Sequence, residues 1–170
     1  MTEEFEILEK EIGPVVEIEE NVKVWQMPKT FGRDYEKINS YLVSNDAECS
    51  GVPYARYVDM VWEKEVNRGL LDNIVAILFK SWHFYAGLPS SKVLQSSGEF
   101  QTQEIKSQKY ARALHKGPYK EVGPVYKALY EWANTQGVTL KNEAIEFYLN
   151  DPADVKPTEI ETEILIALKQ

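Results

Sequence analysis

The last third of the chain shows two different hydrophobic periodicities, which predict one helix followed by two strands. Within 122–133, apolar residues recur every three or four positions, so a helix there has one apolar face, and Gly137 marks its end. Positions 142–149 and 159–168 instead alternate with a period of two, which is typical of half-buried strands. We therefore expect a helix, a strand, a turn and a second strand in this order.

The alternation within these two strands also predicts which side chains share a face. In the first strand Glu146 and Tyr148 fall on the same side, and in the second Glu161 and Glu163 fall on the same side. We expect Glu163 and Tyr148 to face away from the helix and, if their strands are neighbours, to share a surface.

The first half of the chain has a similar pattern. Residues 22–26 are expected to form a strand, and 30–43 carry apolar residues at helical spacing. Residues 54–60 and 74–85 are expected to form strands, the latter because it is rich in β-branched and aromatic residues. Residues 61–73 leave both helix and strand open.

A repeat with an offset of 91 positions relates the two halves. Tyr35 and Tyr126 correspond in the predicted helices, and Tyr57 and Tyr148 correspond in the strands that follow. Each half therefore has the order strand, helix, strand, strand. The prediction is an α+β fold of two pseudo-symmetric repeats, whose antiparallel sheets flank a central ligand cleft.

The repeats define the expected domain organisation. After an acidic lead-in, expected at residues 1–13, we expect one ligand-binding domain at 14–170. Its first repeat covers about 14–97 and its second about 98–170, with the junction in a turn-rich link near Gly98. The glutamates of the first 20 residues are expected mostly to form a solvated surface.

Composition narrows the function classes. The formal net charge of −8 argues against direct nucleic-acid binding, which depends on clustered Lys and Arg. The single Cys49 excludes an intrachain disulfide, and no apolar run is long enough for a membrane span, so a cytoplasmic location is the default. His83 and His115 lack further ligands at metal spacing, and no phosphate-binding glycine loop is present. We expect neither a metal nor a cofactor.

Several segments resemble a known family, the GyrI-like small-molecule-binding domain, which also forms the effector-binding part of multidrug-responsive transcription regulators. The resemblance lies in the following stretches: HKGPY at 115–119, LYEWANTQG at 129–137, FYLNDP at 147–152, TEILIAL at 162–168 and, in the first half, PYARYVD at 53–59. It implies two units around a pseudo-twofold axis with a ligand cleft between them. It also implies that Glu163 is the acidic residue at the bottom of that cleft.

The chain departs from the regulators because it has no room for a helix-turn-helix ahead of the domain and is acidic. It therefore looks like the stand-alone form of the family. That form includes drug- or toxin-binding proteins, proteins described as gyrase inhibitors, and hydrolases of cyclopropane-containing DNA-alkylating compounds.

A carboxylate among aromatic side chains is a natural acceptor for a hydrophobic cation, because burial strips it of water. Aromatic faces add a cation–π attraction of about 0.5–2 kcal/mol per contact. The expected ligand-binding residues are Glu163, Tyr148, Tyr57, Tyr119, Trp82 and Trp62. Pattern alone leaves open that Glu163 faces solvent like Glu161, and that these aromatic residues only pack.

Three functions remain open from the sequence. The first is a binding module for hydrophobic, often cationic or planar, small molecules. The second is a hydrolase in which Glu163 is the general base and Tyr148 or Tyr119 donates a hydrogen bond to the developing oxyanion. The third is an inhibitor of a DNA-binding enzyme, with a protein partner that recognises the acidic surface.

Overall fold

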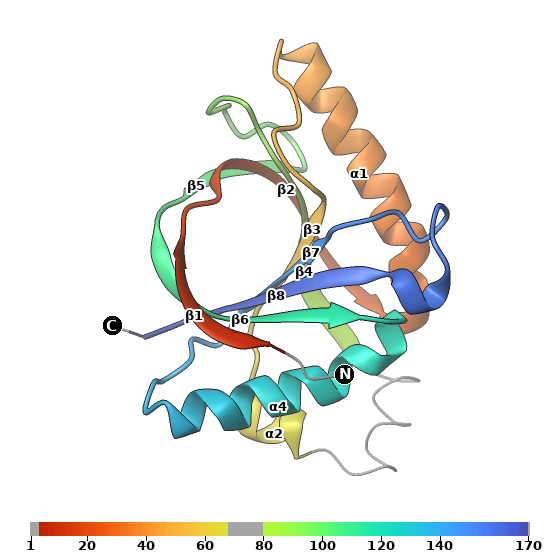
Figure 1. Ribbon diagram of the computed structural model, residues 1–170. Coiled ribbons are helices and arrows are strands. Elements are labelled where there is room, and N and C mark those ends of the chain that lie inside the picture. Colours follow the sequence, from red (N-terminus) through yellow and green to blue (C-terminus); the bar gives the residue numbers. More distant parts are fainter. Residues whose placement is uncertain (1–3, 68–79, 170) are drawn as a thin grey trace. The chain divides into compact units, whose positions relative to one another are not determined.

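The computed structural model describes residues 4–67 and 80–169, and it has the α+β composition predicted from the sequence (Figure 1). The chain divides into two compact units, each built from separate segments. The first unit contains Glu11–Tyr57 and Gly69–Ser107; the second contains Met1–Lys10, Val58–Arg68 and Gln108–Gln170. No helix in the described ranges is long and apolar enough to cross a membrane.

In its described residues, the first unit is a four-stranded antiparallel sheet with one long helix on one face. Its strands follow the order β3-β4-β2-β5. Its elements are β2 (Gly13–Lys23), the 3-10 turn η1 (Val24–Gln26), α1 (Met27–Ser44), β3 (Tyr54–Tyr57), β4 (Ser81–Pro89) and β5 (Phe100–Ile105). Ile38 and Leu42 of α1 pack against Val16, Ile18 and Leu88 of the sheet, which gives this unit its core.

The second unit repeats this design with the strand order β1-β6-β8-β7. Its elements are β1 (Phe5–Lys10), α2 (Trp62–Val66), β6 (Gln108–Lys116), η2 (Tyr119–Glu121), α4 (Val122–Thr135), β7 (Ala144–Tyr148), η3 (Pro157–Glu159) and β8 (Glu161–Ala167). The apolar face of α4 is buried through Val122, Val125, Leu129 and Ala133. Just beyond the helix, Gly137 has a φ of 69°, a left-handed conformation that suits glycine at a helix end.

The predicted repeat of strand, helix, strand and strand is confirmed in both units. It corresponds to β2-α1-β3-β4 in the first and β6-α4-β7-β8 in the second. Each unit adds one edge strand, because β5 pairs with β2 and β1 pairs with β6. Since β5 lies in the first unit, the boundary falls after Ser107, later than the predicted junction near Gly98.

The acidic start of the chain forms strands β1 and β2, and most of its described glutamates are exposed, as predicted, with Glu17 as the buried exception. In β2, Val16 and Ile18 point toward α1, so the intervening Glu17 points to the other face, where it is only 1% exposed. Segment 22–26 is the end of β2 followed by η1 rather than a separate strand. Residues 68–79, which include parts of two predicted segments, lie outside the described residues.

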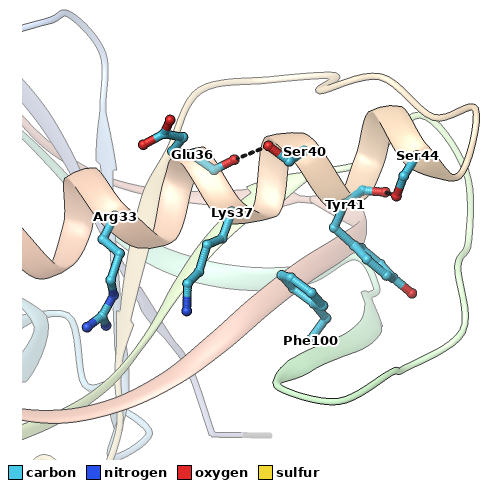
Figure 2. Close-up of a pocket in the computed structure, with 7 residues that line it drawn as sticks. All are labelled: Arg33, Glu36, Lys37, Ser40, Tyr41, Ser44 and Phe100. Atoms are coloured by element: carbon cyan, nitrogen blue, oxygen red, sulfur yellow. Dashed lines mark hydrogen bonds between the residues drawn. The ribbon is translucent and has the colours of Figure 1, made fainter.

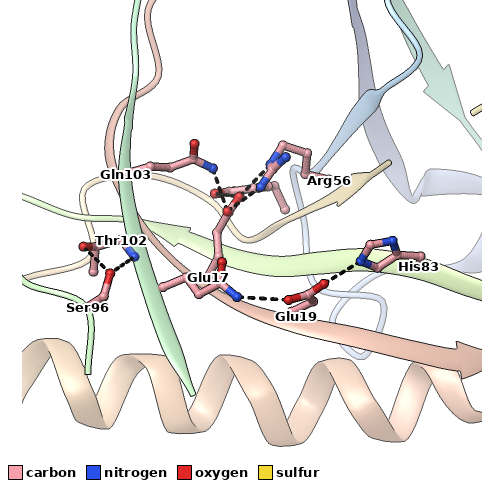
Figure 3. Close-up of polar contacts among 9 residues, drawn as sticks. Glu17, Glu19, Arg56, His83, Ser96, Thr102 and Gln103 are labelled. Carbon is pink, nitrogen blue, oxygen red and sulfur yellow. Dashed lines mark hydrogen bonds and ion pairs between the residues drawn. The ribbon is translucent and has the colours of Figure 1, made fainter. Parts of the chain in front are cut away.

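Glu17 is buried because four donor groups from three side chains satisfy both of its oxygens. Figure 3 shows Arg56 and Gln103 reaching its carboxylate. Arg56 donates from Nε and Nη2 at 2.9 and 2.7 Å, Gln103 at 2.7 Å and the Tyr54 hydroxyl at 2.8 Å. The Tyr54 ring lies over Gly87, where a Cβ atom would be 2.3 Å from the ring's Cζ. Burial, followed by the Glu17 charge, raises the pKa of Tyr54 well above its ordinary value.

Candidate functional site

Glu163 lies on β8 and already has two cationic partners. Lys10 Nζ is 2.5 Å from Oε2, and Arg112 Nε is 2.7 Å from Oε1. Lys10 also lies over the ring of Phe147, 4.7 Å from its centroid. Burial acts to raise the pKa of Glu163, but the hydrogen bonds and the positive charges of Lys10 and Arg112 together outweigh it, so the pKa is lowered. Glu163 is therefore an ionised carboxylate whose charge is balanced within the protein.

Tyr148 does not share a surface with Glu163, so this prediction is wrong. In the register of β7 and β8, Phe147 is opposite Glu163 and Tyr148 is opposite Thr162. Cross-strand partners lie on the same face and successive residues lie on opposite faces. Tyr148 consequently projects from the face that α4 covers, and Glu163 projects from the other.

The carboxylate that does lie beside Tyr148 is Glu146, which is not among the site residues predicted from the sequence. Glu146 is 8% exposed. Tyr126 of α4 donates its hydroxyl proton to Oε1 at 2.8 Å, and the Tyr148 hydroxyl is 3.2 Å from Oε2. Among the residues that the structure describes, no Lys, Arg or His forms an ion pair with it. Burial raises the pKa of Glu146, against the two tyrosine hydrogen bonds, which lower it.

Aromatic side chains surround this acid, and three of them are among the predicted site residues. Trp62 of α2 stacks on Tyr126 with ring centroids 5.8 Å apart, and its Nε1 donates to the Lys141 carbonyl oxygen at 2.7 Å. Tyr119 of η2 contacts Tyr148 edge-on at 5.6 Å. We call Glu146, Tyr126, Tyr148, Tyr119 and Trp62 the Glu146 cluster.

The Glu146 cluster extends from the protein surface to the buried acid. Tyr119 is 41% exposed, whereas Trp62 is 3% exposed. Burial, and after it the nearby carboxylates of Glu146 and Asp151, raise the pKa of Tyr119. The cluster thus presents an aromatic surface at one end and a carboxyl group at the other.

Two more polar side chains lie on the same sheet face. His115 and Thr162 are opposite each other in the register of β6 and β8, and Tyr148 is opposite Thr162 on the other side. His115 Nε2 is 3.3 Å from the Pro118 carbonyl oxygen. Thr162 is fully buried, and its Oγ1 has no hydrogen-bond partner among the described residues.

Replacing Thr162 with Val is expected to raise the free energy of unfolding by about 1 kcal/mol. Valine keeps the shape of the side chain and removes a buried hydroxyl that has no partner. Urea denaturation monitored by circular dichroism measures the change. A loss of stability would mean that an ordered water or another group bonds the hydroxyl.

Tyr57 and Trp82, the other two predicted site residues, lie in the first unit. Their rings contact each other edge-on at 6.2 Å, and Tyr57 also contacts Phe84 at 5.8 Å. Lys80 Nζ lies 3.9 Å from the centroid of the Trp82 ring, so this tryptophan already faces a cation of the protein. Their ligand-binding role stays a prediction, as does the cleft that the resemblance implies.

A shallow groove runs along α1 of the first unit beside Phe100 (Figure 2). Its aromatic floor is Tyr41 stacked on Phe100, with ring centroids 4.3 Å apart. The cations at its rim already have partners, since Arg33 bonds Glu20 and Asp34, and Lys37 bonds Glu99 at 2.8 Å. Both cations of the groove are therefore already paired with carboxylates of the protein.

No metal centre is found in the described part of the chain, where no group of three His, Cys, Asp or Glu side chains is placed to hold an ion. Cys49 is exposed, and its Sγ is 3.1 Å from the Gly51 carbonyl oxygen. The chemistry available in the Glu146 cluster is therefore that of a buried carboxyl group, phenolic hydroxyls and aromatic faces.

Comparison with protein families gives a match to the GyrI-like small molecule binding domain over residues 17–169. A comparison with curated proteins found no match.

Solved structures with a similar fold include regulators and hydrolases. The EcmrR C-terminal domain has a TM-score of 0.72 at 18% identity, covering 100% of this chain and 99% of that one. This chain spans 58% of the EcmrR chain in its complex with DNA. SAV2435 bound to tetraphenylphosphonium has a TM-score of 0.58 at 15% identity, covering 99% and 94%. A hydrolase encoded by lin2189 from Listeria innocua has a TM-score of 0.62 at 12% identity, covering 98% and 91%. At these identities the likeness is one of fold.

Proposed function

We propose that this chain, which belongs to the GyrI-like small-molecule-binding family, binds hydrophobic organic cations at the Glu146 cluster. The observation that carries the proposal is a buried carboxyl group with aromatic neighbours and no cationic partner among the described residues. A cationic ligand would provide the missing positive charge. The cluster replaces Glu163 as the proposed anionic anchor.

The contrast between the two buried acids supports this choice. Glu163 has Lys10 and Arg112 within hydrogen-bond distance, so a ligand cation would have to displace a charged group of the protein. Among the described residues Glu146 has only hydroxyl partners, which stabilise a carboxylate less than a full positive charge does. A cation near Glu146 therefore gains more electrostatic free energy than one near Glu163.

The aromatic members of the cluster favour a ligand that is both charged and apolar. Trp62, Tyr126, Tyr148 and Tyr119 offer ring faces and edges, and each good cation–π contact contributes about 0.5–2 kcal/mol. Such rings also bury the apolar surface of a ligand, whereas a strongly hydrated inorganic cation gains nothing from them. SAV2435 is a neighbour of similar fold that has been solved with tetraphenylphosphonium, a ligand of this kind.

Titration with tetraphenylphosphonium and with neutral triphenylphosphine oxide tests the proposal through quenching of tryptophan fluorescence. Both compounds carry several phenyl rings on phosphorus, and only the first has a positive charge. We expect the cation to bind at least about tenfold more tightly, which corresponds to about 1.4 kcal/mol. Equal affinities for the two compounds would contradict a role for the carboxylate. Trp62→Phe, which removes an indole of the cluster, should reduce the quenching.

A hydrolase is the second candidate, and the two hydroxyls beside Glu146 favour it. A carboxyl group with a raised pKa can take a proton from water as a general base, and a phenolic hydroxyl can donate a hydrogen bond to a developing oxyanion. In this role Glu146 would act in place of Glu163, with Tyr148 as the donor. Incubation with cyclopropane-containing alkylators, followed by mass spectrometry, tests turnover. Unchanged compounds after prolonged incubation would eliminate this candidate.

A further inference from the structure

The hydrogen-bond partners of Glu146 are compatible with either protonation state of its carboxyl group. A tyrosine hydroxyl is both a donor and an acceptor. Tyr126 donates to Oε1 at 2.8 Å in either state, and Tyr148, 3.2 Å from Oε2, can donate to a carboxylate or accept from a carboxylic acid. At Glu163 the partners Lys10 and Arg112 can only donate, so that site requires the ionised form.

Within residues 4–67 and 80–169, no positive charge from the surrounding elements of the second unit compensates Glu146. The groups on its face, or packed against it, are Tyr126 of α4, Tyr148 of β7, Tyr119 of η2, His115 and Ala113 of β6, Thr162 and Ile164 of β8, and Trp62 of α2. Of these, His115 alone can become positively charged. It lies on β6, two strands away from β7, and its ring bonds the Pro118 carbonyl oxygen. The nearby acid Glu63 of α2 adds no positive charge, and its Oε1 accepts a hydrogen bond from the Tyr130 hydroxyl at 3.4 Å.

We propose that Glu146 carries a proton while the cluster is empty and releases it when an organic cation binds, so that the protein exchanges one proton for one cation. This inference rests on the proposed function, because it concerns the same cluster and the same class of ligand. The net charge of the cluster is zero before binding, with a neutral carboxylic acid. It is also zero after binding, with a carboxylate and a cation.

The exchange needs no other reactant. The O–H bond at Glu146 Oε2 breaks, the proton passes to solvent, and the ligand charge takes its place beside the carboxylate. Tyr148, which accepts from the acid in the empty protein, turns its hydroxyl to donate to the carboxylate, and Tyr126 continues to donate. The burial that raises the pKa of Glu146 supports this order of events, since it stabilises the neutral form until a cation arrives.

The sign of the pH dependence follows from this linkage. Below the pKa of Glu146 in the empty protein, binding must first remove a proton, so affinity rises about tenfold for each pH unit. Above that pKa the carboxylate is already ionised, and affinity no longer changes with pH. The stability of the empty protein has the opposite dependence. The contribution of Glu146 is fully present below its ordinary value of 4.5 and is lost as the pH rises through the raised value.

Isothermal titration calorimetry with tetraphenylphosphonium tests the exchange. This cation has no titratable group, so every proton released comes from the protein. Titrations in buffers of the same pH but different protonation enthalpy give the number of protons released. Between pH 4.5 and 8, we expect a value close to one at the acidic end that falls toward zero as the pH rises.

Three variants identify the side chain that releases the proton when the cation binds. Glu146→Gln should bind more weakly, without proton release and without pH dependence. Glu163→Gln, the same change at the acid on the opposite face, should release the proton as the natural sequence does. His115→Gln should also retain the release, which excludes the histidine as its source.

Two negative outcomes are distinguishable. Binding of the cation without proton release anywhere in this pH range would overturn the exchange and leave the proposed function intact. No binding of the cation at any pH would overturn the proposed function, and the exchange with it.

Discussion

Glu146→Gln is expected to weaken the binding of tetraphenylphosphonium at pH 8 by about 100-fold, whereas Glu163→Gln is expected to change it by less than about twofold. At this pH the carboxylate of Glu146 faces the bound cation directly, and a charge-assisted contact in a buried site contributes about 1.5–3 kcal/mol. The glutamine side chain has the same shape and can still bond both tyrosines. Glu163 already bonds Lys10 and Arg112, so its loss removes no charge available to a ligand.

Fluorescence titration of the two purified variants, side by side with the natural sequence, measures this difference. Both variants should first give the circular dichroism spectrum of the folded protein, so that affinity is compared between folded proteins. The opposite result, with weak binding by Glu163→Gln and normal binding by Glu146→Gln, would restore Glu163 as the anchor.

Arg56→Met is expected to lower the free energy of unfolding by about 3–5 kcal/mol. Glu17 is 1% exposed and depends on Arg56 for a bidentate ion pair, so methionine would leave a buried carboxylate without its counter-charge. The Arg56 guanidinium also lies 4.3 Å from the centroid of the Tyr85 ring, a contact that methionine replaces only in part.

The matched control for this variant is Lys37→Met. Lys37 pairs with Glu99 at 2.8 Å, but the side chains are 41% and 48% exposed, so loss of this pair should change stability by no more than about 0.5 kcal/mol. The double variant Arg56→Met with Glu17→Gln should recover part of the loss, because no unpaired charge stays buried. Urea denaturation measures all three. A loss at Arg56 no larger than that at Lys37 would show that the buried pair does not stabilise the fold.

The repeat of strand, helix, strand and strand could be predicted because it depends on local periodicity. Apolar residues at helical spacing around Tyr126, and a period of two around Tyr148, are properties of short stretches. Both halves carry them, and both units have the corresponding elements. Tyr119 and Tyr148 were selected from the second repeat and Trp62 from the stretch 61–73, whose pattern leaves both helix and strand open, and the structure places all three in the Glu146 cluster.

The choice of acid could not be made in the same way, because it depends on pairing between strands. Alternation fixes which residues of one strand share a face, and it grouped Glu146 with Tyr148 correctly. Alternation does not predict which face of β8 lies beside Glu146 and Tyr148. A shift of one residue in the register between β7 and β8 would place Glu163 opposite Tyr148 instead of Thr162. The sequence did contain one clue to the acid: Glu146 lies two positions before Tyr148 and therefore on the same face of the predicted strand.

The burial of Glu17 also could not be predicted from the local sequence pattern. A glutamate in an acidic run is expected to be solvated, and Glu17 is buried only because Arg56 and Gln103, distant in sequence, reach its oxygens. Partners so far along the chain are known only once the strands are paired.

The placement of β1 has a consequence for the order in which this protein folds during synthesis. β1 is formed by Phe5–Lys10, but its partner β6 begins at Gln108. A ribosome adding about 5–20 residues per second needs roughly 5–20 s to make the intervening chain, and the nascent β1 segment has no native partner during that time. Glu6, Glu9 and Lys10 make this segment a poor template for pairing with other chains. Once β6 and β8 are made, Glu6 forms an ion pair with Arg112 and Lys10 forms one with Glu163. The same charges that disfavour pairing of β1 with other chains then stabilise its pairing within the sheet.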